Sequence, residues 1–172
     1  INFTVVQDSV TWTTPSSNLT VSQYEQTSYL LTLDAASAAG SAVSYSANAL
    51  PTGVTLSSGT ISGTLSSAGN STTLLTATAA TTNRSNTRSI TWNVMSDVVT
   101  WTTPASNPLS VTQYEKSSYS LTLNAASAAG RSITYSANTL PSGLTLSGNA
   151  ISGTLNTVAN TSTLLTANAA TT

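Results

Sequence analysis

The side chains that could do acid–base chemistry are few: five carboxylates, with neither a histidine nor a cysteine. The lack of His and Cys removes the usual general bases and thiol nucleophiles of enzymes. Two carboxylates could cleave a glycosidic bond, but only if they share one site. The five are scattered through the chain: Asp8, Glu25, Asp34, Asp97 and Glu115. The sequence therefore predicts solvated or turn-capping carboxylates, no metal or cofactor, and no enzyme activity.

Five Asn-x-Ser/Thr motifs are candidate sites of N-glycosylation. Because Ser and Thr make up over a third of the chain, about five such motifs would arise by chance, so the motif alone is weak. Two of the positions share a predicted surface turn, and another is predicted to point away from a strand's buried face. The five candidates are Asn2, Asn18, Asn70, Asn83 and Asn160.

The surface has too little charge for an electrostatic partner. Charged residues are 5% of the chain and the formal net charge is −1, so neither nucleic acid nor an anionic membrane is an expected partner. No apolar run is long enough to span a bilayer, which predicts no membrane span in the mature chain. An N-terminal Ile fits an exported, processed protein and also a piece of a longer one. The first interpretation is favoured, and with it an extracellular location.

The chain is an internal duplication. Residues 10–15 return as residues 99–104, at an offset of 89, and Pro108 raises the offset to 90 for the rest of the chain. The first copy continues into a strand-like segment at 90–95, and the second copy does not. The counterpart of that segment is at the N-terminus, in residues 1–6. Self-similarity of this kind defines the repeat unit before any element is assigned.

The positions of the aromatic residues argue against a sugar-binding platform. All ten lie in repeat register, whereas a ligand site placed on a fold usually breaks the symmetry of a repeat. Core or edge packing is therefore favoured over carbohydrate stacking. The equivalent pairs are Trp12 with Trp101, Trp92 with Phe3, Tyr24 with Tyr114, Tyr29 with Tyr119, and Tyr45 with Tyr135.

Alternating residues and turn signals predict β-structure. Leu31-Thr32-Leu33 and Val43-Ser44-Tyr45 alternate with the period of a half-buried strand. Leu50-Pro51-Thr52-Gly53 is typical of a type I turn, and Gly148-Asn149 has the length of a hairpin loop. Residues 35–40 are expected to form a loop between sheets, a helical turn being the alternative. About seven short strands per repeat predict an all-β fold of two tandem immunoglobulin-like β-sandwich domains, the second lacking its final strand.

Residues 45–56 and 61–64 resemble the signature of the putative immunoglobulin (cadherin/dystroglycan-like) repeats of surface proteins, and the second copy repeats it at 135–146 and 151–154. The resemblance implies extracellular stalks, adhesins or filaments, without specifying one activity. Leu65 and Leu155 stand where that family usually has Pro. The acidic clusters that bind calcium between cadherin modules are missing, so calcium binding is not implied.

We predict three parts: a donor strand at 1–6, a complete domain at 7–95 and an incomplete domain at 96–172. Ile1, Phe3 and Val5 should face inward as knobs, like Ile90, Trp92 and Val94. A sandwich without its last strand exposes an unpaired edge and an apolar groove, here predicted to include Leu164.

A donor strand held to the first domain cannot reach the second domain of its own chain, because the first domain, on the order of 40 Å long, intervenes. The predicted partner is therefore another copy, in an open head-to-tail homopolymer. The layout resembles the thread filaments of archaeal cell surfaces and, more remotely, bacterial chaperone-assembled pili. The alternative is a fragment of a longer Ig-repeat adhesin or phage fibre with a carbohydrate-binding or stalk role.

Overall fold

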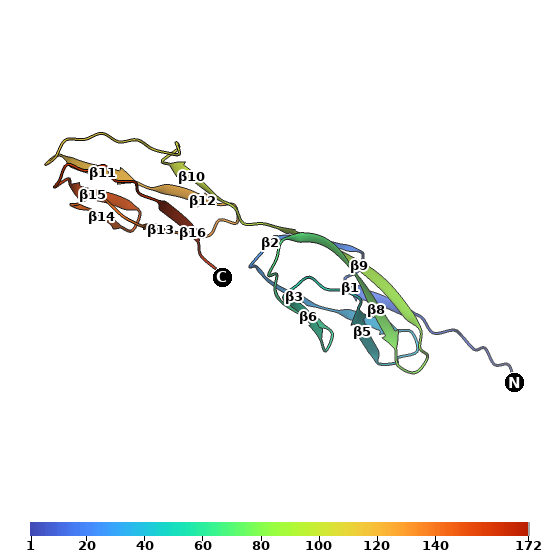
Figure 1. The fold of residues 1–172 in the computed structure, drawn as a ribbon. Helices are drawn as coiled ribbons and strands as arrows, with labels where there is room; N and C mark the ends of the chain where they lie inside the picture. Colours follow the sequence, from blue (N-terminus) through green and yellow to red (C-terminus); the bar gives the residue numbers. More distant parts are fainter. Residues whose placement is uncertain (172) are drawn as a thin grey trace. The chain divides into compact units, whose positions relative to one another are not determined.

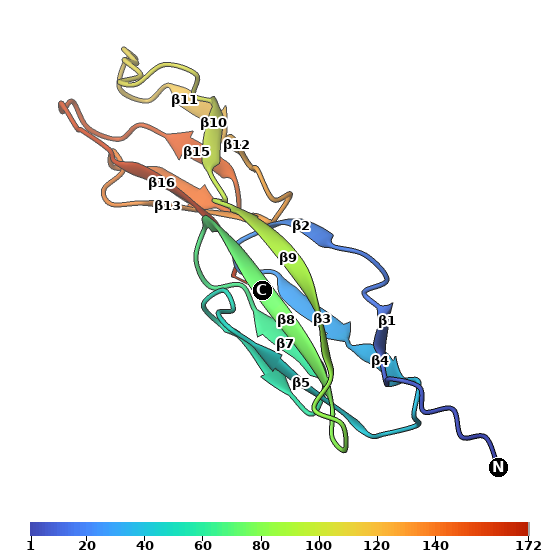
Figure 2. The same ribbon diagram turned by 90° about the vertical axis from the view of Figure 1, so that its right-hand side faces the viewer.

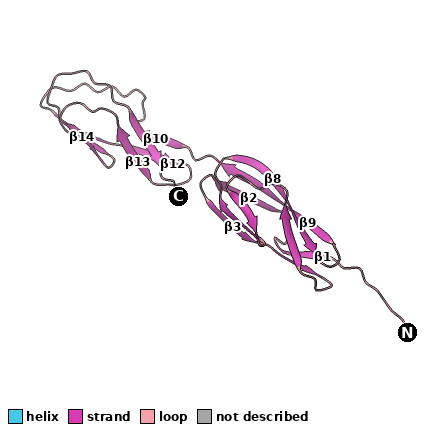
Figure 3. Cartoon of the chain, turned by 60° about the horizontal axis from the view of Figure 1, so that its bottom comes forward, coloured by secondary structure: helices cyan, strands magenta, loops and turns pink. Residues whose placement is uncertain are grey.

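The computed structural model describes residues 1–171, which form two compact units: unit 1, Ile1–Ser96, and unit 2, from Asp97 onward (Figure 1). Every regular element of the described residues is a β-strand (Figure 3). No helix that could cross a membrane is present among them. The predicted all-β class is confirmed.

Unit 1 packs a four-stranded sheet, β2-β9-β8-β5, against a three-stranded sheet, β3-β7-β6, with β1 and β4 as a separate pair (Figure 2). The β2–β9 pairing is parallel, and the other pairings are antiparallel. The strands are β1 (Val10–Thr14), β2 (Leu19–Tyr24), β3 (Ser28–Thr32), β4 (Asp34–Ser37), β5 (Val43–Ala47), β6 (Val54–Ser57), β7 (Thr60–Thr64), β8 (Gly69–Ala79) and β9 (Ser85–Met95).

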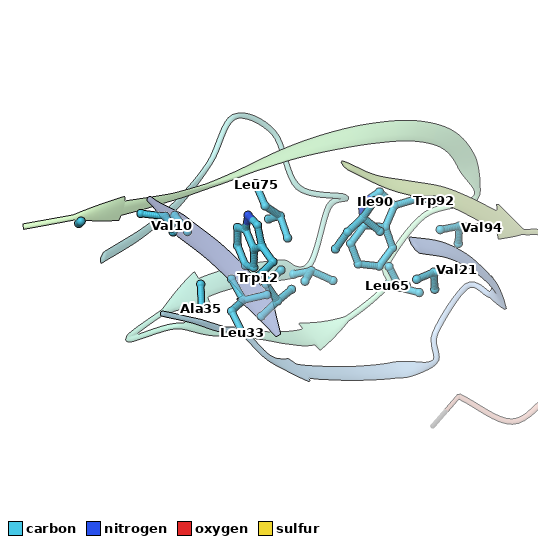
Figure 4. Close-up of a cluster of buried hydrophobic side chains, with 14 residues drawn as sticks. Val10, Trp12, Val21, Leu33, Ala35, Leu65, Leu75, Ile90, Trp92 and Val94 are labelled. Atoms are coloured by element: carbon cyan, nitrogen blue, oxygen red, sulfur yellow. The ribbon is translucent and has the colours of Figure 1, made fainter. Parts of the chain in front are cut away.

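Alternation along these strands builds the core of unit 1. On β9, Ile90, Trp92 and Val94 are buried while the residues between them are exposed, as the sequence pattern predicts. The buried side chains form one cluster between the two sheets (Figure 4). Trp12 stacks obliquely on Tyr45, their ring centroids 5.6 Å apart. Trp12 and Trp92 are thus packing residues of this core, with Tyr29 and Tyr45 packed against it.

Unit 2 repeats seven of these strands with the same partners: β10-β12, β11-β15-β14 and β13-β16. Even the irregularity in the β1–β4 ladder recurs in β10–β12. The strands are β10 (Val99–Thr103), β11 (Ser118–Thr122), β12 (Asn124–Ser127), β13 (Ile133–Ala137), β14 (Leu144–Ser147), β15 (Ala150–Thr154) and β16 (Leu165–Ala169).

The segment at 35–40 differs from its prediction. Its first half belongs to strand β4, and the chain turns only at Ala38–Gly40. Ala has a low strand propensity, which hides the strand in the sequence. The small side chain is nevertheless suited to the place, because buried Ala35 pairs directly with Trp12 across the ladder. The indole fills the space that a larger residue would need.

Two segments that are strands in unit 1 are irregular in unit 2. Residues 109–114 correspond to β2, and residues 159–164 correspond to the first half of β8. In unit 1 both of these elements pair with β9. No strand of the described part of unit 2 takes the place of β9, so both segments lack the partner that orders their counterparts.

Candidate assembly site

Strand β9 of unit 1 defines the position that is open in unit 2. It runs parallel to β2, with Val21 paired to Trp92, and antiparallel to β8, with Thr73 paired to Ile90. The indole Nε1 of Trp92 donates to the buried hydroxyl of Thr73 at 2.8 Å. Its ring meets Tyr29 edge-on, with centroids 4.8 Å apart, and burial raises the pKa of that tyrosine. A buried strand with both ladders satisfied is thus central to unit 1.

In unit 2 the counterparts of the residues that enclose β9 are uncovered. Val21 is 7% exposed, whereas its counterpart Val111 is 48% exposed, and Tyr114 at the end of the same segment is 89% exposed. Thr163 keeps the bond of its counterpart, donating to the carbonyl of Thr139 at 2.5 Å as Thr73 donates to Ala49. Leu165, whose counterpart is fully buried, is only partly covered. The described part of unit 2 therefore has counterparts of the residues that flank β9, without a strand between them.

The N-terminal segment has the pattern of β9 and makes no ladder. Ile1, Phe3 and Val5 are 109%, 87% and 95% exposed, and residues 1–9 form no strand. The segment extends away from the sheets of unit 1 (Figures 1 and 2). Large apolar side chains at this spacing are costly to leave in water, so the segment is a candidate for burial elsewhere.

The base of this segment is fastened to unit 1. The carboxylate of Asp8 accepts hydrogen bonds from the hydroxyls of Ser37 and Thr82 and from the amide of Ala39, at 2.6–2.9 Å. With its amide oxygen turned toward Arg84, Gln7 accepts two further bonds, at 2.9 and 3.0 Å. The donated bonds, that of Thr82 foremost and then that of Ala39, hold the pKa of Asp8 below the ordinary 3.8. Only residues 1–6 are therefore left without attachment.

Asp97 does the same at the start of unit 2. It accepts from the amide of Ala129 and the hydroxyl of Ser127, and it pairs with Arg131 at 3.1 Å. These groups, the Ala129 amide foremost, lower the pKa of the Asp97 carboxyl. The two aspartates are thus loop anchors, and the described residues contain no cluster of three His, Cys, Asp or Glu that could hold a metal.

Leu164 lies on the outer face of its sheet. It is 66% exposed, and its counterpart Leu74 is 44% exposed even in the complete unit. The core-facing neighbours in β8 are Thr73 and Leu75, both fully buried, because alternation places residues 73 and 75 on the side opposite to residue 74. The unit 1 template therefore assigns the acceptor surface to Thr163 and Leu165, with Leu109 and Val111 on the other side, and leaves Leu164 outside it.

The structure separates the candidate glycosylation sites. All five side chains are exposed, those of Asn2, Asn18, Asn70, Asn83 and Asn160. Asn83 adopts a positive φ of 54° in the β8–β9 turn, a conformation that asparagine tolerates. Asn18 differs, since its side-chain oxygen accepts from the amide of Ser89 at 3.0 Å. A glycan on the side-chain nitrogen of Asn18 would have to be compatible with the hydrogen bond from Ser89 to the side-chain oxygen.

The hollow along β5 and β6 of unit 1, about 710 Å³ in volume, has little to offer a ligand. It is lined by small and aliphatic residues with Tyr45 as its one aromatic, and the hydroxyl of Tyr45 already accepts from the amide of Ala35 at 2.8 Å. No carboxylate lines it. A smaller hollow beside Tyr135 repeats the arrangement in unit 2, as a feature of the scaffold would.

With this geometry in place, comparison with protein families gives a clear result. The family described as "Putative Ig domain" matches residues 4–95 and 100–172, nearly the whole chain. The chain belongs to that family, and its fold is a tandem of two immunoglobulin-like domains, as the sequence predicts.

Similar solved structures come from larger proteins. An endo-fucoidan hydrolase of glycoside hydrolase family 107, variant H294Q of MfFcnA4, is 16% identical over 92% of this chain and 28% of its own, with a TM-score of 0.45. Extracellular domains 3–5 of Drosophila OTK are 12% identical over 92% of this chain and 59% of their own, with a TM-score of 0.41.

Cadherin domains 1–4 of protocadherin gamma B7 are 13% identical over 89% of this chain and 42% of their own, with a TM-score of 0.42. The chain thus spans less than two thirds of the length of each of these structures. Comparison with curated proteins gives no match.

Proposed function

We propose that this chain is a structural, non-enzymatic subunit of an extracellular filament of the pilus or thread type, in which residues 1–6 of one copy complete unit 2 of the next. One observation carries the proposal. The described part of unit 2 has counterparts of the residues that enclose β9 in unit 1, but no strand in the place of β9, and the unpaired N-terminal segment has the inward pattern of β9 at a constant offset of 89 residues. Strand addition to an exposed edge is an established mode of association.

Unit 1 supplies the expected orientation of the donor. By analogy with β9, residues 1–6 run parallel to 109–114 and antiparallel to 159–164. Ile1 then takes the place of Ile90 between Leu109 and Thr163, and Phe3 takes the place of Trp92 beside Val111. A shift of one residue would turn the apolar side chains toward solvent, so the alternation fixes the register.

Burial of the three donor side chains is the main driving force. At about 1.5–3 kcal/mol for each large apolar residue, it contributes about 5–8 kcal/mol. About six ladder hydrogen bonds add about 0.5–1.5 kcal/mol each. The cost of ordering the donor and residues 109–114 and 159–164 offsets part of this gain. The balance favours association, because both partners begin with unsatisfied edges.

The contact is heterologous, since donor and groove are different surfaces. Repetition of a heterologous contact that does not close yields an open polymer. N-linked glycans at four of the exposed candidate sites, Asn2, Asn70, Asn83 and Asn160, would give solubility to a surface with few charges. Asn2 lies on the outward side of the proposed donor strand, where a glycan would not enter the groove.

Deletion of residues 1–6 tests the proposal. The expected result is a folded, monomeric chain by light scattering and no filaments by electron microscopy. A matched control keeps the composition and reverses the faces by exchanging Ile1 with Asn2 and Phe3 with Thr4, and it should also fail to assemble. Filaments formed by either variant, with the same spacing as the unmodified chain, would refute the proposal.

A second candidate follows from the same open groove. In a longer tandem array, the chain itself could continue and supply the missing strand, giving an adhesin or fibre segment with a stalk or carbohydrate-binding role. The mass of the native polypeptide under denaturing conditions decides between the two. A mass near 17.4 kDa plus glycans supports the filament subunit, and a multiple of it supports the array. Binding to a glycan array by the monomer would add the adhesin role.

A further inference from the structure

The sheet that faces β9 in unit 1 contains a row of residues whose size can be compared between the two units. In unit 1, Tyr29, which contacts Trp92, stands in one row across the facing sheet with Gly63 and Val54. The glycine leaves a gap in this row, and it cannot be filled, since a Cβ there would lie 2.0 Å from the carbonyl oxygen of Gly53. The tyrosine that meets the indole of Trp92 is thus followed in its row by a gap and by Val54, which is buried in the same core as Trp92.

Unit 2 has the same row with one change. Tyr119, Gly153 and Leu144 align across β11, β15 and β14, and a Cβ on Gly153 would again lie 2.0 Å from a carbonyl oxygen, that of Gly143. Leucine replaces the valine of unit 1, which makes the row larger by one methylene. On the opposite side, the donor segment has the smaller Phe3 where β9 has Trp92. The two changes compensate in volume.

Size, and not polarity, distinguishes the two grooves. In unit 1 the N–H of Trp92 donates to the hydroxyl of Thr73, but Thr163 repeats that threonine in unit 2, so the hydroxyl does not discriminate between the strands. Phe3 fits unit 2 because a smaller ring suits the larger row. Each groove therefore matches one of the two similar strands in size.

We infer, building on the filament proposed above, that Phe3 and Leu144 are a size-matched specificity pair, through which unit 2 selects the N-terminal segment over a strand of the β9 type. Selection matters because each copy carries two strands of the same apolar pattern and two grooves that accept it. Insertion of β9 into unit 2 of another copy would swap domains, and insertion of the tail into unit 1 would end assembly. Volume complementarity penalises both errors.

The test is a double-mutant cycle between acceptor and donor. The acceptor is the chain without residues 1–6, with Leu144 or with L144V, and unit 1 keeps its own β9 in both. The donor is a labelled peptide of residues 1–8, unmodified or F3W, and the dissociation constant is measured by fluorescence anisotropy. We expect F3W to weaken binding to the Leu144 acceptor about tenfold, the effect of overpacking a groove, and to bind the L144V acceptor at least as well as the unmodified peptide.

Two controls keep the outcomes distinct. The L144M acceptor has nearly the same volume as the original, so it should keep the preference for Phe3 and also reveals whether substitution at this site disturbs folding. If F3W changes binding to both acceptors by the same factor, the inference is overturned and the filament proposal stands. If no peptide binds any acceptor, the filament proposal itself is overturned.

Discussion

Units 1 and 2 repeat one sequence pattern, from which the described part of unit 2 lacks the segment equivalent to β9, and their interiors differ widely. Fourteen apolar side chains are buried in unit 1, and three, Leu123, Ala125 and Ile151, are buried among the described residues of unit 2. These three have counterparts in unit 1 on or beside strands that do not pair with β9. Losing a central strand therefore uncovers one side of the sandwich and leaves the other packed. A core depends on which strands enclose it as much as on which residues it contains.

The two units also differ in the segments that would flank a strand in the place of β9. Strand β2 and the first half of β8 are ordered in unit 1 because each has β9 as a ladder partner. Their counterparts in unit 2 have the same alternation and remain irregular. Strand propensity and pattern are therefore insufficient for a strand without a neighbour to pair with.

The largest effect should come from removing the centre of the complete core. Trp92→Ala is expected to destabilise unit 1 by about 3–5 kcal/mol, because it opens a cavity and leaves Thr73 without its donor. The matched control is Trp101→Ala in unit 2, where the indole is only partly buried and the cost should be smaller. Urea unfolding of the chain without residues 1–6 measures both. Equal costs would contradict the contrast between the two cores.

The next effect should come from completing unit 2 within one chain. Moving residues 1–6 to the C-terminal side of Thr172 through a flexible linker should stabilise unit 2 by several kcal/mol, on the order of the burial of three apolar side chains. Hydrogen exchange should slow at residues 109–114 and 159–164 as they become strands. The same fusion with the faces of the donor reversed is the control. Exchange that stays fast in both fusions would argue against the proposed occupant.

Equivalent valine-to-alanine substitutions in the two units should show whether a strand covers each valine. Val21→Ala is expected to cost unit 1 about 2 kcal/mol, because that valine is buried beside Trp92. Val111→Ala should cost the monomer little, since the side chain is half exposed, and should cost the assembled filament about as much as Val21→Ala costs unit 1. Denaturant midpoints of monomer and filament test this. A large loss in the monomer would mean that its groove is already covered.

The smallest effect concerns pH. The pKa of Asp8 and that of Asp97 are both lowered below 3.8, so the stability that each contributes is complete above about pH 5 and is lost as the pH falls through the folded-state pKa. Asp8→Asn and Asp97→Asn should each flatten this acid dependence in thermal melts between pH 2 and pH 6. An acid profile unchanged in both variants would show that the two anchors do not titrate with folding.

The sequence could predict the fold because its signal is periodic and duplicated. The inward phase of Ile90, Trp92 and Val94 is confirmed by their burial, since alternation and the repeat offset both specify it. The strand at residues 34–37 could not be predicted from alanines, whose role depends on an indole across the ladder. The role of residues 109–114 could not be predicted from the sequence either. Their counterpart in unit 1, β2, pairs in parallel with β9, about 70 residues further along the chain, and such a long-range contact has no local sequence signal.

Thr73 is the clearest omission. Its hydroxyl links Trp92 to a backbone carbonyl deep in the core, but one threonine has no distinct signal in a chain where over a third of residues are Ser or Thr. Thr73 and Leu75 face the core of unit 1 and Leu74 does not, so the acceptor residue that the sequence predicts, Leu164, corresponds to the outer face of β8. Leu164 and Leu165 are adjacent leucines, and the sequence alone does not show which of the two faces the core.

The anchoring of Asp8 has a mechanical consequence. Two residues separate Val5 from Asp8, and two separate Val94 from Asp97, so each β9-type strand is followed at the same distance by a clamped loop. In the proposed filament, tension applied through Gln7 would pull the inserted strand along its own length. The ladder hydrogen bonds would then bear the load in shear and together, instead of opening one after another. A joint without a covalent bond could therefore resist traction about as well as the intact domain beside it.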